Sequence, residues 1–355
     1  ALPIYPVKIE ALWNFTHDAL LHTGLREADA KTVADTLVTT DCFGVLSHGT
    51  KNLYQYILKC QAGGLDPKAI PTVEKEGPAW AILNGNCAFG MVSACKGMTL
   101  AVEKARACGI GYVGEHNSCH FGAAGYYANI AARNGMIGLS MSNADPNMAV
   151  PNSSGVAIGN NPFSFAIPYK DGRSIFLDMA LSNVAALKVV MAREKGLQVP
   201  SGWLVDLDGQ PTNDPSGFPG SSFLLPVGAH KGYGLAVLVE ALSAVLTGAG
   251  ILSEVHSWNL DLKAKNNTGN AFIAIDISQI MPMPLFEQRM EQMVQELKSR
   301  PLAKGAEKIY LPGEIEWEKR QAAEACGILT LTDAMVENMQ QLSALTGIGI
   351  EWTEK

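Results

Sequence analysis

Residues 109–114 read Gly-Ile-Gly-Tyr-Val-Gly, and this stretch decides between two kinds of α/β fold. The spacing matches the G-x-G-x-x-G pattern of dinucleotide-binding turns, which requires a strand before the first glycine and a helix after the last. Here the order is reversed, because a helical pattern over 91–107 ends at Gly109 and Ile110–Val113 has the pattern of a strand. We therefore interpret the stretch as a helix stop followed by a buried strand. It predicts an α/β (α+β) fold with a mixed central sheet that is not of the Rossmann type.

Strands and helices alternate on both sides of this stretch, and the two ends of the chain are helical. Hydrophobic periodicity predicts strands over 72–75, 79–84, 110–115, 136–142, 163–168, 174–179 and 271–276. It predicts helices over 9–22, 26–40, 53–60, 91–107, 121–133, 184–195, from about 231, and over 284–299, 315–326 and 332–345. A loop rich in Pro, Gly and Asp spans 197–222. We expect both termini, 1–75 plus 285–355, to form one mostly helical domain beside a central sheet domain, 76–284.

Composition restricts the class of protein. The 355 residues are 47% hydrophobic and 17% charged, with a net charge of −7 and no basic cluster, so nucleic acid is not an expected partner. The longest apolar segment, 232–251, contains Glu240 and several glycines, so we interpret it as a buried helix and expect no membrane span. Seven cysteines without a C-x-x-C pair, and no secretory signal, favour reduced thiols and a cytoplasmic location.

The stretch Ser47-His48-Gly49 follows the second predicted helix. Histidine is the side chain whose ordinary pKa lets it exchange protons near neutral pH. Ser47 can orient the imidazole, and Gly49 allows a sharp turn or the close approach of a ligand. His48 is therefore a candidate general acid or base, and a helix end without chemistry is the alternative.

A second polar stretch, His116-Asn-Ser-Cys-His120, holds three potential metal ligands in five residues. A fourth ligand at recognisable spacing is not evident, so we expect no metal. The chain continues His120-Phe121-Gly122-Ala123-Ala124 into a predicted helix that opens with small residues. Free backbone N–H groups at such a start suit a phosphate or a carboxylate. A simple helix cap at His120 is the alternative.

Four later stretches are weaker candidates. Asp178 ends an apolar strand, where a carboxylate is costly unless it is paired or functional, and it could fix the imidazole if it meets Ser47 and His48. Gly159-Asn160-Asn161-Pro162 could recognise a polar small molecule or form a plain turn. Lys231 lies at a helix start and could hold a phosphate, although its surroundings are not a P-loop. Leu311-Pro-Gly-Glu314 is a turn with one acid.

Together these stretches resemble the malate/L-lactate dehydrogenase family that is unrelated to the Rossmann-type lactate and malate enzymes. The resemblance covers most of the chain and rests on six motifs in the family's order. They are Ser47-His48-Gly49, Asn117-Ser-Cys-His-Phe-Gly-Ala123, Asn161-Pro162, Asp178-Met-Ala180, Lys231-Gly-Tyr-Gly-Leu235 and Pro312-Gly-Glu314. The resemblance implies a homodimer with a non-Rossmann sheet domain that interconverts a 2-hydroxy acid and a 2-oxo acid with NAD, or with NADP.

The resemblance also implies a role for each candidate residue. His48 would give a proton to the carbonyl oxygen, with Ser47 and Asp178 completing its relay, and His120 would face the same site, where some relatives use it as the acid/base. The cofactor would be held by His120, Phe121, Gly122, Ala123, Ala124, Asp178, Met179, Ala180, Lys231, Pro312, Gly313 and Glu314. Delivering a hydride to one carbon and a proton to its oxygen needs one positioned acid and no metal.

Departures from the family's pattern point to the substrate-binding residues. Many relatives carry an arginine shortly after Ser-His-Gly, where this chain has Lys51-Asn52, and lysine does not reproduce the bidentate geometry of arginine. Asn160 replaces a threonine of the family's Gly-Thr-Asn-Pro. We therefore expect Lys51, Asn52 and Asn160 to contact the substrate, with malate as the first expectation. The alternatives are another 2-oxo acid, a cyclic imine acid, a catalytically idle binding subunit and a histidine-based metal hydrolase.

Overall fold

A computed structural model describes residues 5–352. Its centre is a seven-stranded mixed sheet in the order β2-β3-β4-β13-β5-β8-β9. The strands are β2 (Thr72–Gly77), β3 (Trp80–Asn84), β4 (Ile110–Ser118), β13 (Thr268–Asp276), β5 (Met136–Ser142), β8 (Phe163–Pro168) and β9 (Ser174–Met179). Only β3 and β4 run parallel, and the other neighbours in this sheet are antiparallel. The expected mixed, non-Rossmann α/β fold is confirmed.

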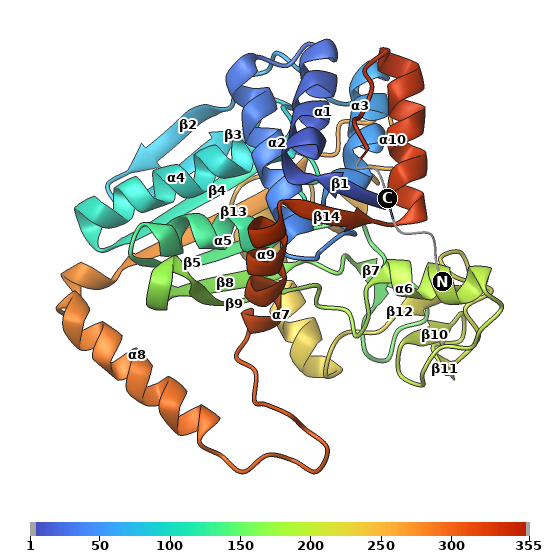
Figure 1. The fold of residues 1–355 in the computed structure, drawn as a ribbon. Helices are drawn as coiled ribbons and strands as arrows, with labels where there is room; N and C mark the ends of the chain where they lie inside the picture. Colours follow the sequence, from blue (N-terminus) through green and yellow to red (C-terminus); the bar gives the residue numbers. More distant parts are fainter. Residues whose placement is uncertain (1–4, 353–355) are drawn as a thin grey trace.

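The stretch 109–114 behaves as a helix stop followed by a strand. Helix α4 (Gly90–Cys108) ends at Gly109, whose φ of 85° lies in the left-handed region that favours glycine, and β4 begins at Ile110. α4 and α5 (Ala124–Arg133) pack on the sheet, where Phe272 of β13 contacts the core beneath them (Figure 1). The start of α5 lies three residues later than expected, because Gly122 adopts a left-handed φ of 79°.

A second sheet lies beside the first and was not predicted. It has five short strands in the order β11-β10-β12-β6-β7, and three of them, β10, β11 and β12, fall in or at the end of the loop expected over 197–222. The helix before this region, α6 (Ala186–Glu194), agrees with the helix expected over 184–195. The strands are β11 (Pro211–Thr212), β10 (Leu204–Asp206), β12 (Ser222–Leu224), β6 (Met148–Ala149) and β7 (Val156–Ile158). Leu204 and Leu224 form a core with Met141 of β5, so the two sheets share side-chain packing. Strands of two or three residues are too short for periodicity to reveal.

The two ends of the chain lie together (Figure 1). β1 (Tyr5–Lys8) pairs antiparallel with β14 (Ile328–Leu331), and neither strand was predicted. One hydrophobic core joins α1 (Ile9–His22), α2 (Glu27–Cys42) and α3 (Leu53–Gln61) to α10 (Asp333–Thr346). Phe43, just after α2, stacks edge-on with Trp317 of α9 (Glu314–Cys326). This packing agrees with helical termini that come together.

Two other helices differ from the expected pattern. α7 (His230–Glu240) begins where expected, but a five-residue π-helix, Ala241–Val245, continues it. α8 (Met283–Lys298) projects from the body (Figure 1), and its Met290 and Val294 pack with Ile175 of the central sheet rather than with the helices of the termini. Within residues 5–352, no helix is both long enough and apolar enough to cross a membrane.

Candidate active site

A cavity of about 680 Å³ lies between the helices of the termini and the two sheets. Its walls come from the turn before α3, the start of α5, the ends of β5 and β9, and the loop before β13. The predicted site residues that line it are Ser47, His48, Lys51, Asn52, His120, Phe121, Gly122, Ala123, Ala124, Asn160, Asp178, Met179, Ala180 and Gly313. The volume lies within the range typical of sites for small molecules and cofactors.

The turn that carries His48 is fixed by a buried carboxylate beneath it. Asp41 of α2 accepts hydrogen bonds from the Thr50 backbone N–H at 3.1 Å and from its hydroxyl at 2.6 Å. A Cβ atom on Gly49 would lie 1.9 Å from the Asp41 Oδ1 atom, so this close contact requires glycine. Burial raises the pKa of Asp41 to about 7, and the bonds from Thr50 oppose the rise.

Ser47 orients the His48 ring. The Ser47 hydroxyl and His48 Nδ1 are hydrogen-bonded at 2.8 Å, and the Asn52 side-chain amide donates to the Ser47 carbonyl at 3.0 Å. Burial lowers the pKa of His48 below its usual 6.5, and the nearby Lys51 ammonium lowers it further. Most His48 side chains are therefore neutral near pH 7, which is the form that accepts a proton.

His120 lies across from His48 in an aromatic stack. The two imidazoles are 5.8 Å apart, and the Trp258 indole lies parallel to His120 with ring centres 4.4 Å apart. On its other side, His120 Nδ1 is 2.6 Å from the hydroxyl of Tyr56 on α3. Burial, helped by His48, lowers the pKa of His120 to about 3.

Asp178 lines the same cavity, but the expected relay from Asp178 to Ser47 and His48 is not formed. The Asp178 Oδ2 atom accepts a hydrogen bond at 2.7 Å from the backbone N–H of Gly125, in the first turn of α5. Asp178 therefore occupies one of the free N–H groups expected to suit a ligand. Burial raises the pKa of Asp178 to about 6, the Gly125 N–H opposes this, and Glu316 adds to it.

Three predicted cofactor residues lie outside the cavity lining. Lys231 is exposed at the start of α7. Pro312 gives its backbone carbonyl to the Phe176 N–H at 3.2 Å. Glu314 forms ion pairs with Lys298 and Lys308 at 2.7 and 3.0 Å. Of the Pro312-Gly-Glu314 turn, only Gly313 reaches the cavity.

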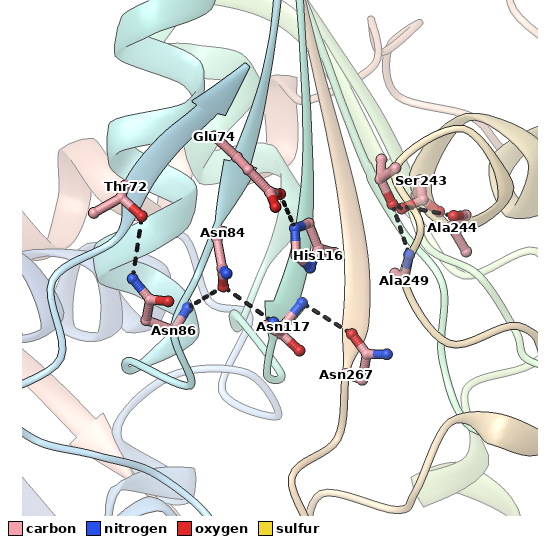
Figure 2. A network of polar contacts seen from close by, with 11 residues as sticks. Thr72, Glu74, Asn84, Asn86, His116, Asn117, Ser243, Ala244, Ala249 and Asn267 are labelled. Carbon is pink, nitrogen blue, oxygen red and sulfur yellow. Dashed lines mark hydrogen bonds and ion pairs between the residues drawn. The ribbon is translucent and has the colours of Figure 1, made fainter.

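The three potential metal ligands over 116–120 point in different directions. His116 Nε2 is 2.6 Å from a carboxylate oxygen of Glu74 on β2 (Figure 2), and neither residue lines the cavity. The Cys119 thiol lies 3.2 Å from Asn266 Oδ1, and His120 bonds to Tyr56. Among the residues that the structure describes, no three His, Cys, Asp or Glu side chains gather as a metal site.

Several residues of the site were missed from the sequence. Trp258 and Asp145 line the cavity, and Tyr56 supports it from behind. Asn161, expected as a ligand-binding or turn amide, is buried and donates at 2.8 Å to Glu240, which also accepts from Asn143. The one available signal was the tryptophan within 256–261, a stretch that is mostly polar. A large aromatic side chain outside the core leaves apolar surface in contact with water unless it packs at a site.

Comparison with known proteins gives the same class of enzyme as the sequence motifs. The family described as malate/L-lactate dehydrogenase matches residues 7–340. A malate dehydrogenase of Pyrococcus abyssi is 38% identical over 312 residues, covering 86% of this chain and 85% of the relative. The NAD(+) ureidoglycolate dehydrogenase of Escherichia coli O157:H7 is 35% identical, covering 91% and 92%. The solved sulfolactate dehydrogenase of Methanocaldococcus jannaschii superposes with a TM-score of 0.90 at 33% identity, covering 98% of both chains.

The fold and the cavity thus define a dehydrogenase of 2-hydroxy acids that uses a nicotinamide cofactor and a small-molecule acid. The chain belongs to the malate/L-lactate dehydrogenase family.

Proposed function

We propose that this enzyme interconverts a 2-hydroxy acid and a 2-oxo acid with His48 as the general acid/base. The observation that carries the proposal is the fixed His48 ring in the shared cavity, bonded to Ser47 at 2.8 Å and held over Asp41. In the oxidation direction, neutral His48 takes the proton of the substrate hydroxyl. In the reduction direction, its protonated form returns that proton to the carbonyl oxygen.

The cofactor fits the wall formed by the start of α5. Gly122 has no side chain and Ala123 and Ala124 have small ones, and they lie beside backbone N–H groups at a helix N-terminus. We propose that these residues, with Met179 and Ala180, hold NAD, and that NADP is the alternative. When bound, the nicotinamide supplies or accepts the hydride.

We assign the substrate carboxylate to Lys51. Among the described residues, it is the single lysine or arginine that lines the cavity, and burial lowers its pKa. Asn52 and Asn160 lie in the same lining and can add hydrogen bonds. The Lys51 ammonium group is a point charge and lacks the planar fork of an arginine. We therefore expect it to attract one substrate carboxylate by charge, without two parallel hydrogen bonds.

The cavity lining also contains hydrogen-bond acceptors. Asp145 lines the cavity, and the Oδ1 atom of Asn147 is buried there with no hydrogen-bond partner among the described residues. A second carboxylate near Asp145 would be repelled, whereas a group with N–H donors would be bound. Malate and oxaloacetate remain the first pair to assay, and acids with an amide or imine group form the second set.

The test is a panel of 2-oxo acids assayed with NADH and with NADPH, followed at the nicotinamide absorbance. The panel contains oxaloacetate, pyruvate, an amide-bearing 2-oxo acid and a cyclic imine acid. Turnover of a 2-oxo acid, unchanged by a metal chelator, supports the proposal. Failure of both cofactors to bind would remove it.

We also propose that the enzyme is a homodimer. The helix α7 and the residue that follows the π-helix expose apolar side chains, with Leu238 50% and Leu246 59% exposed. Exposed apolar patches of this kind are typical of protein interfaces. The double substitution Leu238→Glu and Leu246→Glu should give a monomer in light scattering after gel filtration; an unchanged mass would contradict this interface.

A cytoplasmic location and the division into two domains complete the proposal. The seven cysteines are unpaired, as expected for a reducing compartment. We propose the division 1–75 plus 285–355 against 76–284 on the packing of the termini. α8 is the exception within 285–355, because it packs against the sheet domain through Met290.

A further inference from the structure

We infer that Tyr56 is a positioning residue that fixes the ring of His120 as a neutral hydrogen-bond donor to a substrate oxygen. The inference rests on the proposed function for the identity of the acceptor. The juxtaposition itself is independent of that function, because it concerns the bond between the Tyr56 hydroxyl and His120 Nδ1.

The direction of this bond follows from the burial of Tyr56. The side chain lies on α3 and is 1% exposed, and among the described residues its hydroxyl has one hydrogen-bond partner, His120 Nδ1 at 2.6 Å. A phenol carries one donor, and leaving a buried O–H unpaired is costly. Burial also raises the pKa of Tyr56 well above its usual value, so the phenol keeps its proton. Tyr56 therefore donates, and His120 Nδ1 accepts.

This direction sets the tautomer of His120. A neutral imidazole has one N–H and one bare nitrogen, so a bare Nδ1 places the proton on Nε2. The low pKa of His120 keeps the ring neutral throughout the physiological range. The stack against Trp258, with ring planes 8° apart, holds the ring in its plane.

The Nε2–H group then faces the cavity. His120 lines the cavity, and among the described residues its Nε2 atom has no hydrogen-bond partner. This atom is not fully enclosed by protein, so it is accessible from the cavity. A neutral imidazole N–H can donate to a carbonyl or carboxylate oxygen, but it cannot accept a proton through the same nitrogen. His48 and His120 therefore divide the work: His48 moves the proton, and His120 orients the oxygen-bearing substrate.

The loop that carries Trp258 is tied to the helix that carries Tyr56. Lys59 on α3 donates to the carbonyls of Asp261 and Ala264 at 2.9 and 2.7 Å, and Gln55 donates to the carbonyl of Asn259 at 2.7 Å. The two partners of His120 therefore belong to one joined unit. This arrangement explains how a loop residue can hold a ring with the precision that orientation requires.

The first test reads the tautomer by nitrogen NMR of protein with ¹⁵N-labelled histidine, and it needs no substrate. We expect wild-type His120 to show the neutral Nε2–H form without titration from about pH 5 to pH 8. We expect Tyr56→Phe to give a mixture of tautomers. A wild-type ring with its proton on Nδ1, or a spectrum unchanged by Tyr56→Phe, would overturn the inference whether or not the enzyme reduces 2-oxo acids.

The second test is a double-mutant cycle on turnover. Tyr56→Phe should lower kcat/KM for the 2-oxo acid about tenfold, mainly through KM, with an unchanged Kd for the reduced cofactor. His120→Gln keeps a side-chain N–H donor without the Nδ1 contact, so adding Tyr56→Phe to it should cost little more. Tyr54→Phe, on the same helix but outside the cavity lining, is the matched control and should behave as wild type. Additive losses, or a loss confined to cofactor Kd, would contradict the assignment to a substrate oxygen.

Discussion

The carboxylate of Asp41 lies 2.6 Å from the hydroxyl of Thr50 and directly beneath Gly49, so a buried acid on α2 holds the turn that presents His48. A catalytic ring gains from such support because a small displacement of an acid/base group lowers the rate strongly. Through this contact, helix α2 of the terminal core supports the turn that carries His48.

Removing the Asp41 carboxylate should reduce both stability and turnover. Asp41→Ala leaves the Thr50 N–H and hydroxyl without their acceptor, which costs about 1–3 kcal/mol of the free energy of unfolding. We expect turnover to fall because the His48 turn loosens. Urea unfolding and steady-state assays check the two effects. Thr50→Val, which removes only the hydroxyl bond, should give a smaller loss, and a larger loss in that variant would contradict this account.

Asp41 should also make stability depend on pH in a defined window. Its pKa is about 7 in the folded protein and 3.8 ordinarily, so the folded state binds the proton more tightly. The free energy of unfolding should therefore fall as pH rises from about 4 to about 7, and Asp41→Asn should lack this component. The measurement is urea unfolding of both proteins at several pH values. Parallel curves for the two proteins would count against a raised pKa.

Lys51 should contribute, after burial, to the pH at which reduction slows. Reduction needs protonated His48, so kcat/KM for the 2-oxo acid should fall as pH rises through the lowered pKa of His48. Lys51→Met removes the positive charge that contributes to this lowering, so the fall should move to higher pH, and KM should rise. The exposed Lys68→Met is the control and should leave the profile in place. An unmoved profile in Lys51→Met would show that the two groups do not interact.

Asp145 should discriminate against substrates with two carboxylates. Asp145→Asn removes a negative charge from the cavity wall, so kcat/KM for oxaloacetate should rise about fivefold relative to pyruvate, the factor that corresponds to about 1 kcal/mol. Asp208→Asn makes the same charge change at an exposed position outside the lining. An equal ratio in wild type and Asp145→Asn would remove Asp145 from substrate selection.

Much of the fold followed from local patterns in the sequence. The long helices over 9–22 and 91–107 were predictable because each buries residues at helical spacing. Central strands such as β3 and β13 were predictable because they are short apolar runs that are buried in the sheet. The pairing of Tyr5–Lys8 with Ile328–Leu331 was not, because it joins two four-residue strands more than 300 positions apart. Local periodicity carries no information on such a pairing.

The residues of the site also divide into those that short sequence motifs predict and those that they do not. Ser47, His48, His120 and Asp178 could be proposed from short motifs, and the structure brings all four to one cavity. Tyr56 could not be found, since a tyrosine at a buried helical position has the pattern of a core residue until its hydroxyl meets His120. Lys231 is exposed and outside the cavity lining, and its motif could not show this, because a lysine at a helix start is also a common solvated residue. The roles of all these residues remain predictions.

The most direct test of the central claim is His48→Ala, assayed together with reduced-cofactor binding by fluorescence titration. The variant should lose most turnover of the 2-oxo acid, by a factor of about 10²–10⁴, because it lacks the group that we propose gives the proton to the carbonyl oxygen. Cofactor Kd should stay near the wild-type value, since the start of α5 is untouched. Near-normal turnover in His48→Ala would contradict the account.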